Sequence, residues 1–105
     1  MVTRRTEGAV DAFKKCIAKY PQFEWPYGNL GSLYLKSGDY KQAEFYLNKA
    51  ISINPDYVNA LHHFTELELR QGHKEKALEF LNRISSADPY ESQVDLQKLA
   101  IEMSL

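Results

Sequence analysis

The chain has 105 residues, of which 44% are hydrophobic and 26% are charged, a composition that fits one soluble globular domain. A net charge of −1 shows no basic excess, which argues against binding to nucleic acid or to an anionic membrane surface. No apolar run approaches the ~18 residues of a membrane-spanning helix, and the single cysteine, Cys16, excludes an internal disulfide framework and allows a reducing compartment, so we expect a cytoplasmic location.

The first three predicted elements are helices, each marked by apolar residues at helical spacing. The first covers about residues 6–19, and its stripe consists of Ala9, Phe13, Cys16 and Ile17. The second covers residues 25–36, with the stripe Tyr27, Leu30, Gly31 and Tyr34. A turn at Ser37-Gly38-Asp39 follows, because glycine adopts the left-handed conformation after a helix and aspartate caps the next one. The third helix ends before Pro55, and its buried stripe consists of Ala43, Leu47, Ala50 and Ile51.

The same elements recur further along the chain. The glycine turn returns at Gln71-Gly72-His73, and Asp88-Pro89 ends the second hairpin. The buried positions that we predict for the fourth and fifth helices are Leu61, Phe64, Ala77, Leu81 and Ile84. For a sixth helix we predict the buried stripe Leu96, Leu99, Ala100 and Met103. This last stripe fits the earlier spacing only if one residue is inserted near Tyr90 to Ser92.

A period of 34 residues connects these elements. Three series of equivalent positions keep it, namely Pro21, Pro55 and Pro89, then Ala9, Ala43 and Ala77, then Phe13, Leu47 and Leu81. Agreement across several residue types indicates a true internal repeat. The chain therefore divides into a half repeat at 1–23, which holds only a second helix, full repeats at 24–57 and 58–91, and a terminal capping or half-repeat helix at 92–105.

The period, the small residues and the closing proline resemble the tetratricopeptide repeat family, whose pattern is W-x2-L-G-x2-Y, then A-x3-F and a proline. The stretch Tyr27-x2-Leu30-Gly31-x2-Tyr34 matches the first helix, with tyrosine for tryptophan. In the second repeat Thr65 replaces the glycine and Glu68 the last aromatic residue. The resemblance implies an all-α fold in which about six helices form antiparallel hairpins, stacked as a right-handed superhelical solenoid.

Each hairpin of such an array leaves an apolar face open until the next one covers it. Because this chain begins on a second helix, we expect an uncovered flank around Ala9, Phe13 and Cys16. Residues 4–7 are too polar to supply the missing helix. Two explanations remain open: the chain is a piece of a longer array, or the flank pairs with another chain in a homo-oligomer.

In the family that the chain resembles, the first helices line a concave face that holds partner peptides or helices. The candidate residues of the first full repeat are Trp25, Gly28, Asn29, Ser32, Leu35 and Lys36. The second full repeat contributes Asn59, His62, His63, Glu66, Leu69 and Arg70. The last helix contributes Val94, Gln97, Lys98 and Ile101. The asparagine side chains could form hydrogen bonds with a peptide main chain, and the apolar members could contact its side chains. The alternative is that these residues form a solvated face that binds no partner.

One subclass of the family grips the C-terminal carboxylate of chaperones with lysines, an arginine and asparagines. The corresponding positions here are Gly28, Ser32, His63, Val94 and Lys98. Only Lys98 is basic, so we do not expect a carboxylate clamp.

The sequence carries no signature of an enzyme. It has no phosphate-binding glycine loop, nucleophile elbow or paired carboxylates. Cys16 occupies a small apolar position, so we expect it to be buried and unreactive. His62 and Glu66 could supply two metal ligands, but no third follows at a suitable spacing. We therefore predict no catalytic residue, no metal and no cofactor.

The predicted function is a protein–protein interaction module that binds a partner peptide or helix on its concave face. Two alternatives stay open. One is self-assembly through the N-terminal flank, and the other is a role as the accessory arm of a larger enzyme.

Overall fold

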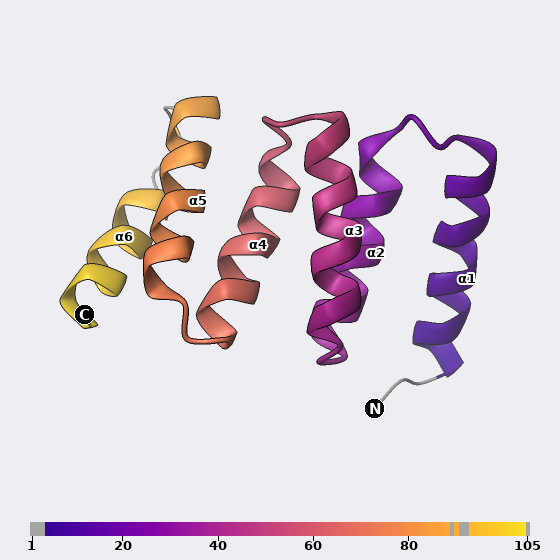
Figure 1. Ribbon diagram of the computed structural model, residues 1–105, viewed down its shortest axis with the longest axis horizontal. Coiled ribbons are helices and arrows are strands. Elements are labelled where there is room, and N and C mark those ends of the chain that lie inside the picture. Colours follow the sequence, from indigo (N-terminus) through magenta and orange to yellow (C-terminus); the bar gives the residue numbers. More distant parts are fainter. Residues whose placement is uncertain (1–3, 89, 91–92, 105) are drawn as a thin grey trace.

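The computed structural model describes residues 4–88, 90 and 93–104. Within them the helices are α1 (Arg4–Lys19), α2 (Glu24–Lys36), α3 (Tyr40–Ile53), α4 (Val58–Arg70), α5 (Lys74–Ala87) and α6 (Gln93–Ser104). They stand side by side from α1 at one end to α6 at the other (Figure 1), in a body of 41 × 29 × 19 Å. The all-α prediction with about six helices is confirmed. The residue insertion predicted near Tyr90 to Ser92 falls largely outside the described residues.

The two glycine turns are built alike. Gly38 has a φ of 83° and Gly72 a φ of 81°, the left-handed region in which glycine alone is unstrained. The N–H of Asp39 donates to the carbonyl of Tyr34 at 2.9 Å, and the N–H of His73 donates to that of Glu68 at 2.8 Å. These bonds satisfy the last carbonyls of α2 and α4 and turn the chain into the next helix. The predicted cap of α3 is present, since the Asp39 carboxylate accepts from the N–H of Gln42 at 3.3 Å.

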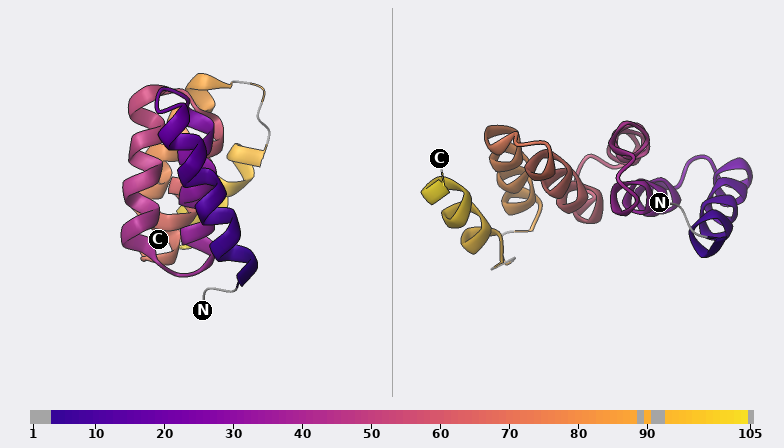
Figure 2. Two further views of the ribbon diagram at one scale, coloured as in Figure 1. Left: turned by 90° about the vertical axis from the view of Figure 1, so that its right-hand side faces the viewer. Right: turned by 90° about the horizontal axis from the view of Figure 1, so that it is seen from below.

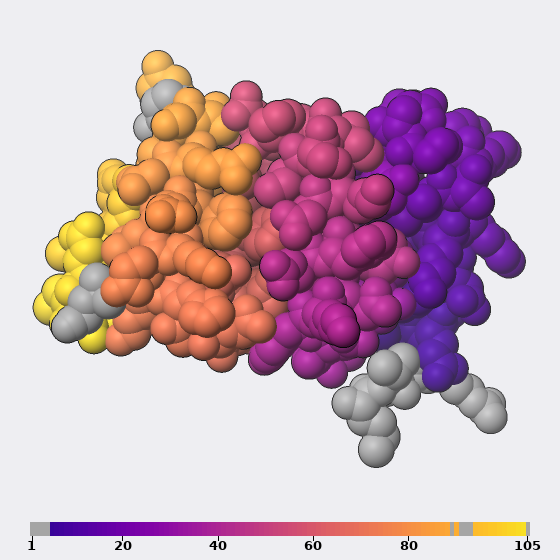
Figure 3. All heavy atoms as spheres, in the orientation of Figure 1, coloured from indigo at the N-terminus to yellow at the C-terminus, as the bar shows by residue number. Residues whose placement is uncertain are grey.

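The core of the first full repeat depends on one close approach between α2 and α3. A Cβ atom placed on Gly31 would lie 2.7 Å from Cγ of Leu47, which is closer than carbon atoms pack. Ala43 and Ala50, the small residues of α3, are fully buried in the same cluster. Side chains also close the spaces between neighbouring helices on the face that Figure 3 shows. The two helices of this repeat therefore pack closely because small residues on one lie against larger residues on the other.

The second full repeat is held together differently. Thr65, which replaces the glycine, is buried, and its hydroxyl donates to the carbonyl of Leu61 at 2.9 Å. Glu68, which replaces the aromatic residue, is also buried, and its Oε2 lies 2.7 Å from Nδ1 of His73. Both departures from the family pattern thus have a hydrogen-bonding partner, as buried polar groups require.

The N-terminal helix α1 covers part of α2. Ile17 packs against the core, and the rings of Phe13 and Trp25 meet edge to face at 6.4 Å between centroids. Cys16 is half-buried rather than buried as predicted, because no helix precedes α1 among the described residues to cover its other side. Views from the side and from below (Figure 2) place α1 at one end of the row. None of the helices described is long and apolar enough to cross a membrane.

The prediction for the buried side of α6 is wrong. Val94 and Ile101, seven residues apart and so on one helical face, pack with Leu81 and Ile84 of α5. The predicted stripe is instead exposed, and its members are Leu96, Leu99, Ala100 and Met103. Spacing alone identified one apolar face of α6 correctly, but it is the other apolar face, with Val94 and Ile101, that packs against α5.

Candidate functional site

Most residues predicted on the concave face have accessible side chains on the first helix of each repeat. We call this surface the first-helix face, and its members are Trp25, Asn29, Ser32, Lys36, Asn59, His62, His63, Glu66, Leu69, Arg70, Gln97 and Lys98. The helices α2 and α4 that carry most of them contact each other directly. The face is therefore continuous across the two full repeats.

Four predicted members do not lie on this face. Leu35, Val94 and Ile101 are buried in the core, so no partner can reach their side chains. Gly28 is buried as well, because a Cβ there would lie 2.8 Å from Cε2 of Tyr57. Its lack of a side chain serves helix packing rather than ligand access. Helical phase had placed all four residues on the concave face.

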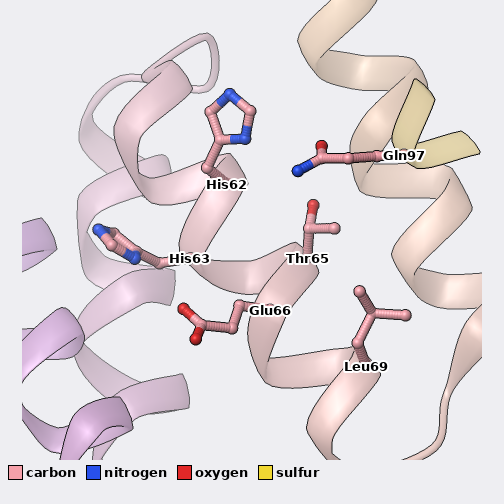
Figure 4. A pocket seen from close by; sticks show the side chains of 6 residues that line it. All are labelled: His62, His63, Thr65, Glu66, Leu69 and Gln97. Carbon is pink, nitrogen blue, oxygen red and sulfur yellow. The ribbon is translucent and has the colours of Figure 1, made fainter. Parts of the chain in front are cut away.

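A pocket of about 340 Å³ lies on this face between α4 and α6. It is lined by His62, His63, Thr65, Glu66, Leu69 and Gln97 (Figure 4). Figure 4 shows His62 and Thr65 on the side of α4 that faces Gln97, and His63 and Glu66 on the other side. Leu69 adds an exposed apolar wall. The pocket thus offers one apolar contact among uncharged and charged hydrogen-bonding groups.

Arg70 is engaged within the protein. Its Nη1 donates to the carbonyl of Leu35 at 3.2 Å, and its Nη2 donates to Oε1 of Glu66 at 2.8 Å. The neighbouring Tyr40 hydroxyl and, after it, the Glu66 carboxylate raise the pKa of Arg70 above its ordinary value. Arg70 therefore ties the last turn of α4 to that of α2, and this role was not evident from helical phase.

The surroundings of His63 favour the neutral form of its ring. Burial of the ring lowers the pKa of His63 below its ordinary value of 6.5; Glu66 opposes this shift, and Lys36 and His62 add to it. A neutral imidazole offers one donor and one acceptor. Together with the amides of Asn29 and Asn59, it gives the face groups that suit the main chain of a peptide.

No group of three metal-binding side chains converges in the part of the chain that the structure describes. His62, His63 and Glu66 line the same pocket without forming such a group. Thr65 is a pocket residue that sequence reasoning had not placed there. Its signal in the sequence was the threonine at a position where the repeat pattern has glycine.

A second hollow, of about 300 Å³, lies on α3 and was not predicted. It is lined by Phe45, Asn48, Lys49 and Ser52. Phe45 is exposed, and Nζ of Lys49 lies 5.9 Å from the centroid of its ring. All four residues come from one helix, whereas Gln97 of α6 lines the first pocket together with residues of α4.

Solved structures that resemble this chain are single domains of similar size. The first TPR of Spaghetti (RPAP3), bound to the HSP90 peptide SRMEEVD, has a TM-score of 0.87 at 19% identity and covers 94% of this chain and 80% of that one. The Arabidopsis OM64 TPR domain has a TM-score of 0.85 at 16% identity, with coverages of 97% and 84%. The TPR2B domain of yeast Sti1, in its pHsp70 complex, has a TM-score of 0.85 at 20% identity, with coverages of 96% and 86%. At these identities the likeness confirms the solenoid fold.

Sequence comparison identifies the family. The Protein CTR9 homolog of Arabidopsis thaliana is 33% identical over 72 residues, which cover 69% of this chain. The match spans only 7% of that much longer relative. Two family models described as "Tetratricopeptide repeat" match residues 34–99 and 12–45. With its 34-residue period and its paired glycine turns, the chain belongs to the tetratricopeptide repeat family.

Proposed function

We propose that this chain is a protein–protein interaction module that holds a partner peptide or helix on its first-helix face. The observation that carries the proposal is the pocket between α4 and α6, where His62, Leu69 and Gln97 combine an apolar wall with hydrogen-bonding groups. Similar solved domains that hold Hsp90 and Hsp70 peptides support the same kind of role. The module is proposed to act in the cytoplasm and to catalyse no reaction itself.

The chemistry of the face favours an extended segment with one apolar anchor. The amides of Asn29 and Asn59 and the neutral ring of His63 can pair with main-chain groups, while Leu69 receives the anchor. Interfaces commonly combine an apolar centre with a polar rim in this way. Lys36 and Lys98 add positive charge to this face and suit a partner of mildly acidic character.

A carboxylate clamp is not part of the proposal. Of the five positions that correspond to clamp residues, Gly28 is covered by Tyr57 and Val94 is buried. Ser32 and His63 are uncharged, which leaves Lys98 as the single cation. One flexible lysine cannot reproduce the several converging charges that fix a terminal carboxylate.

Peptides selected by display against the 105-residue chain test the site. Leu69→Glu puts a charge into the pocket, and Asn29→Ala removes an amide; each should weaken a selected peptide by about tenfold or more, which is ~1.4 kcal/mol. Phe45→Glu, at the exposed hollow of α3, is the matched control and should leave Kd unchanged. Equal affinity for the Leu69→Glu/Asn29→Ala double variant, with unchanged helicity, would refute the placement on the first-helix face.

The clamp question has its own probe. The peptide SRMEEVD, which the similar Spaghetti domain binds, can be offered with a free or an amidated C-terminus. We expect no difference in affinity between the two forms. A marked loss on amidation would show that this chain does grip a terminal carboxylate.

Self-assembly through the N-terminal flank receives less support. Ala9, Phe13 and Cys16 are already half-buried, and the outward residues Asp11 and Lys15 are exposed and charged. An accessory role in a larger enzyme is not favoured by any single observation.

A further inference from the structure

The first-helix face has two apolar members, and they lie at its opposite ends. Trp25 is in the first turn of α2 and is 42% exposed. Leu69 is in the last turn of α4 and is 41% exposed. The other members of the face are polar or charged. Covering apolar surface is the main favourable term in most protein association, so these two side chains are the places where a partner gains most.

Leu69 occupies a position that is buried in the preceding repeat. One period of 34 residues earlier stands Leu35, which is fully buried where α4 packs on α2. Leu69 is exposed because α6 packs on α5 and makes no such contact with α4 among the described residues. The space between α4 and α6 is the pocket of about 340 Å³ that Leu69 lines together with Gln97 (Figure 4). A position of the core is thus open to an apolar side chain from outside.

The ring of Trp25 is positioned by the helix before it. Phe13 of α1 meets this ring edge to face at 6.4 Å between centroids. In the connection between α1 and α2, the rings of Tyr20 and Phe23 are also exposed, and their centroids lie 5.7 Å apart. Tryptophan is among the residues most enriched where binding energy is concentrated, and a ring that is already packed on one edge loses little freedom on binding.

The helices α2 and α4 run parallel and nearly in register. Near their beginnings, a Cβ on Gly28 would lie 2.8 Å from the ring of Tyr57, the residue before α4. At their ends, Nη1 of Arg70 donates to the carbonyl of Leu35 at 3.2 Å. Residues one period apart therefore lie at nearly the same level along the two helices.

This register sets the distance between the two apolar members. Leu69 is level with Leu35, which stands ten residues beyond Trp25 and therefore about 15 Å further along the helix axis. Neighbouring helices are about 8–10 Å apart, so the diagonal from Trp25 to Leu69 measures about 18 Å. An extended chain advances about 3.1–3.4 Å per residue, and about six residues span this diagonal.

The groups beside this diagonal suit an extended main chain better than a helix. The amides of Asn29 and Asn59 offer donors and acceptors, and the surroundings of His63 favour its neutral form, which offers one of each. A helix bonds its main chain internally and cannot use such groups. An extended segment presents N–H and C=O groups along its length.

We infer that the first-helix face binds an extended partner segment through two large apolar residues about six positions apart, one at Leu69 and one at Trp25. This inference rests on the proposed function and adds a second anchor to it. Side chains at i and i+6 point the same way in a strand, which repeats every two residues, and in a polyproline II helix, which repeats every three. Lys36 acts electrostatically on His63 beside the diagonal, so an acidic residue between the anchors is favoured.

Peptides selected by display against the 105-residue chain test the spacing. Their aligned sequences should share two large apolar residues at i and i+6. Inserting one residue between these two should weaken binding by about tenfold or more, because one anchor then points away from the face. This change is made in the peptide, so it leaves the fold of the chain untouched.

Variants of the chain assign each anchor to its site. Trp25→Ala and Leu69→Ala should each weaken a selected peptide by about tenfold. Replacing one peptide anchor by alanine should then cost little further affinity in the variant that lacks its matching residue, as a double-mutant cycle measures. Phe45→Ala removes an exposed aromatic side chain from α3 and is the matched control, for which we expect an unchanged Kd.

The outcomes separate this inference from the proposed function. Peptides that depend on Leu69 but are unaffected by Trp25→Ala and by the insertion would overturn the inference and leave the proposed function standing. A shared spacing of about eleven residues would do the same, because it places two side chains on one face of a helix. Peptides that tolerate both alanine variants at unchanged helicity, or a selection that yields no peptide, would count against both.

Discussion

Two glycine-to-alanine substitutions test the close approach of α2 and α3. Gly31 and Gly8 both lie inside helices, so alanine improves helix propensity at each. Their surroundings differ completely. A Cβ on Gly31 would lie 2.7 Å from Cγ and 3.2 Å from the backbone N of Leu47, whereas nothing lies within 4 Å of a Cβ on Gly8.

The expected effects have opposite signs. Leu47 is fully buried and its backbone belongs to α3, so neither can move away without disturbing the core. Forcing an extra methyl group into a packed core costs about 1–3 kcal/mol, and the gain in propensity returns up to about 1 kcal/mol. Because the side chain and the backbone of Leu47 both obstruct the methyl group, we expect a cost in the upper part of this range, about 2–3 kcal/mol, so that Gly31→Ala lowers the free energy of unfolding by about 1–2 kcal/mol. Gly8→Ala should raise it by about 0.5–1 kcal/mol.

Thermal and urea unfolding followed by circular dichroism measure both variants. A loss of 1–2 kcal/mol corresponds to a fall in Tm of roughly 5–10 °C for a domain of this size. The urea m-value should stay constant, because the surface exposed on unfolding is unchanged. If Gly31→Ala is neutral or stabilising, as Gly8→Ala is expected to be, the contact between Gly31 and Leu47 does not limit packing and the reasoning fails.

The remaining predictions concern a turn and a titration. Gly38→Ala should cost about 1–2 kcal/mol in urea unfolding because φ is 83°, and an unchanged midpoint would contradict the turn geometry. Burial lowers the pKa of His63, so the ring binds a proton more tightly in the unfolded chain than in the folded one. The neutral His63 therefore favours the folded state fully above pH ~6.5, and this stabilisation is lost as the pH falls below that value. His63→Gln should remove that part of the pH dependence of the free energy of unfolding. If this free energy varies with pH in the same way in both proteins, His63 makes no such contribution.

Much of the fold follows from local rules that a single sequence displays. Glycine at positions 38 and 72 marks the turns because no other residue adopts that backbone conformation freely. Proline at 55 marks the end of α3 for an equally local reason. Repetition of these signals at a fixed interval then identifies the family, since each hairpin packs on a copy of itself.

The parts that sequence reasoning missed depend on contacts between helices. Leu35 satisfied the phase of the open face, but it lies where α4 covers the last turn of α2. Arg70 is exposed on the first-helix face as predicted, but the sequence did not indicate that its guanidinium donates to the carbonyl of Leu35, 35 residues away. On α6 the sequence offers two apolar faces, and the fit of Val94 and Ile101 to α5 decides between them. Periodicity shows that a helix has an apolar face, but it does not show which other helix that face packs against.

The unequal construction of the two full repeats bears on how the array opens. In a linear array each unit is stabilised only by its neighbours, so loss of structure begins at the ends and spreads inward. The helices α2 and α3 pack closely through small residues and have α1 on one side and α4 on the other. They should show the slowest amide exchange, while α1 and α6 should exchange first. A protein bound at either end would then protect the nearest helix before any other, since it adds a neighbour on the side where the described residues supply none.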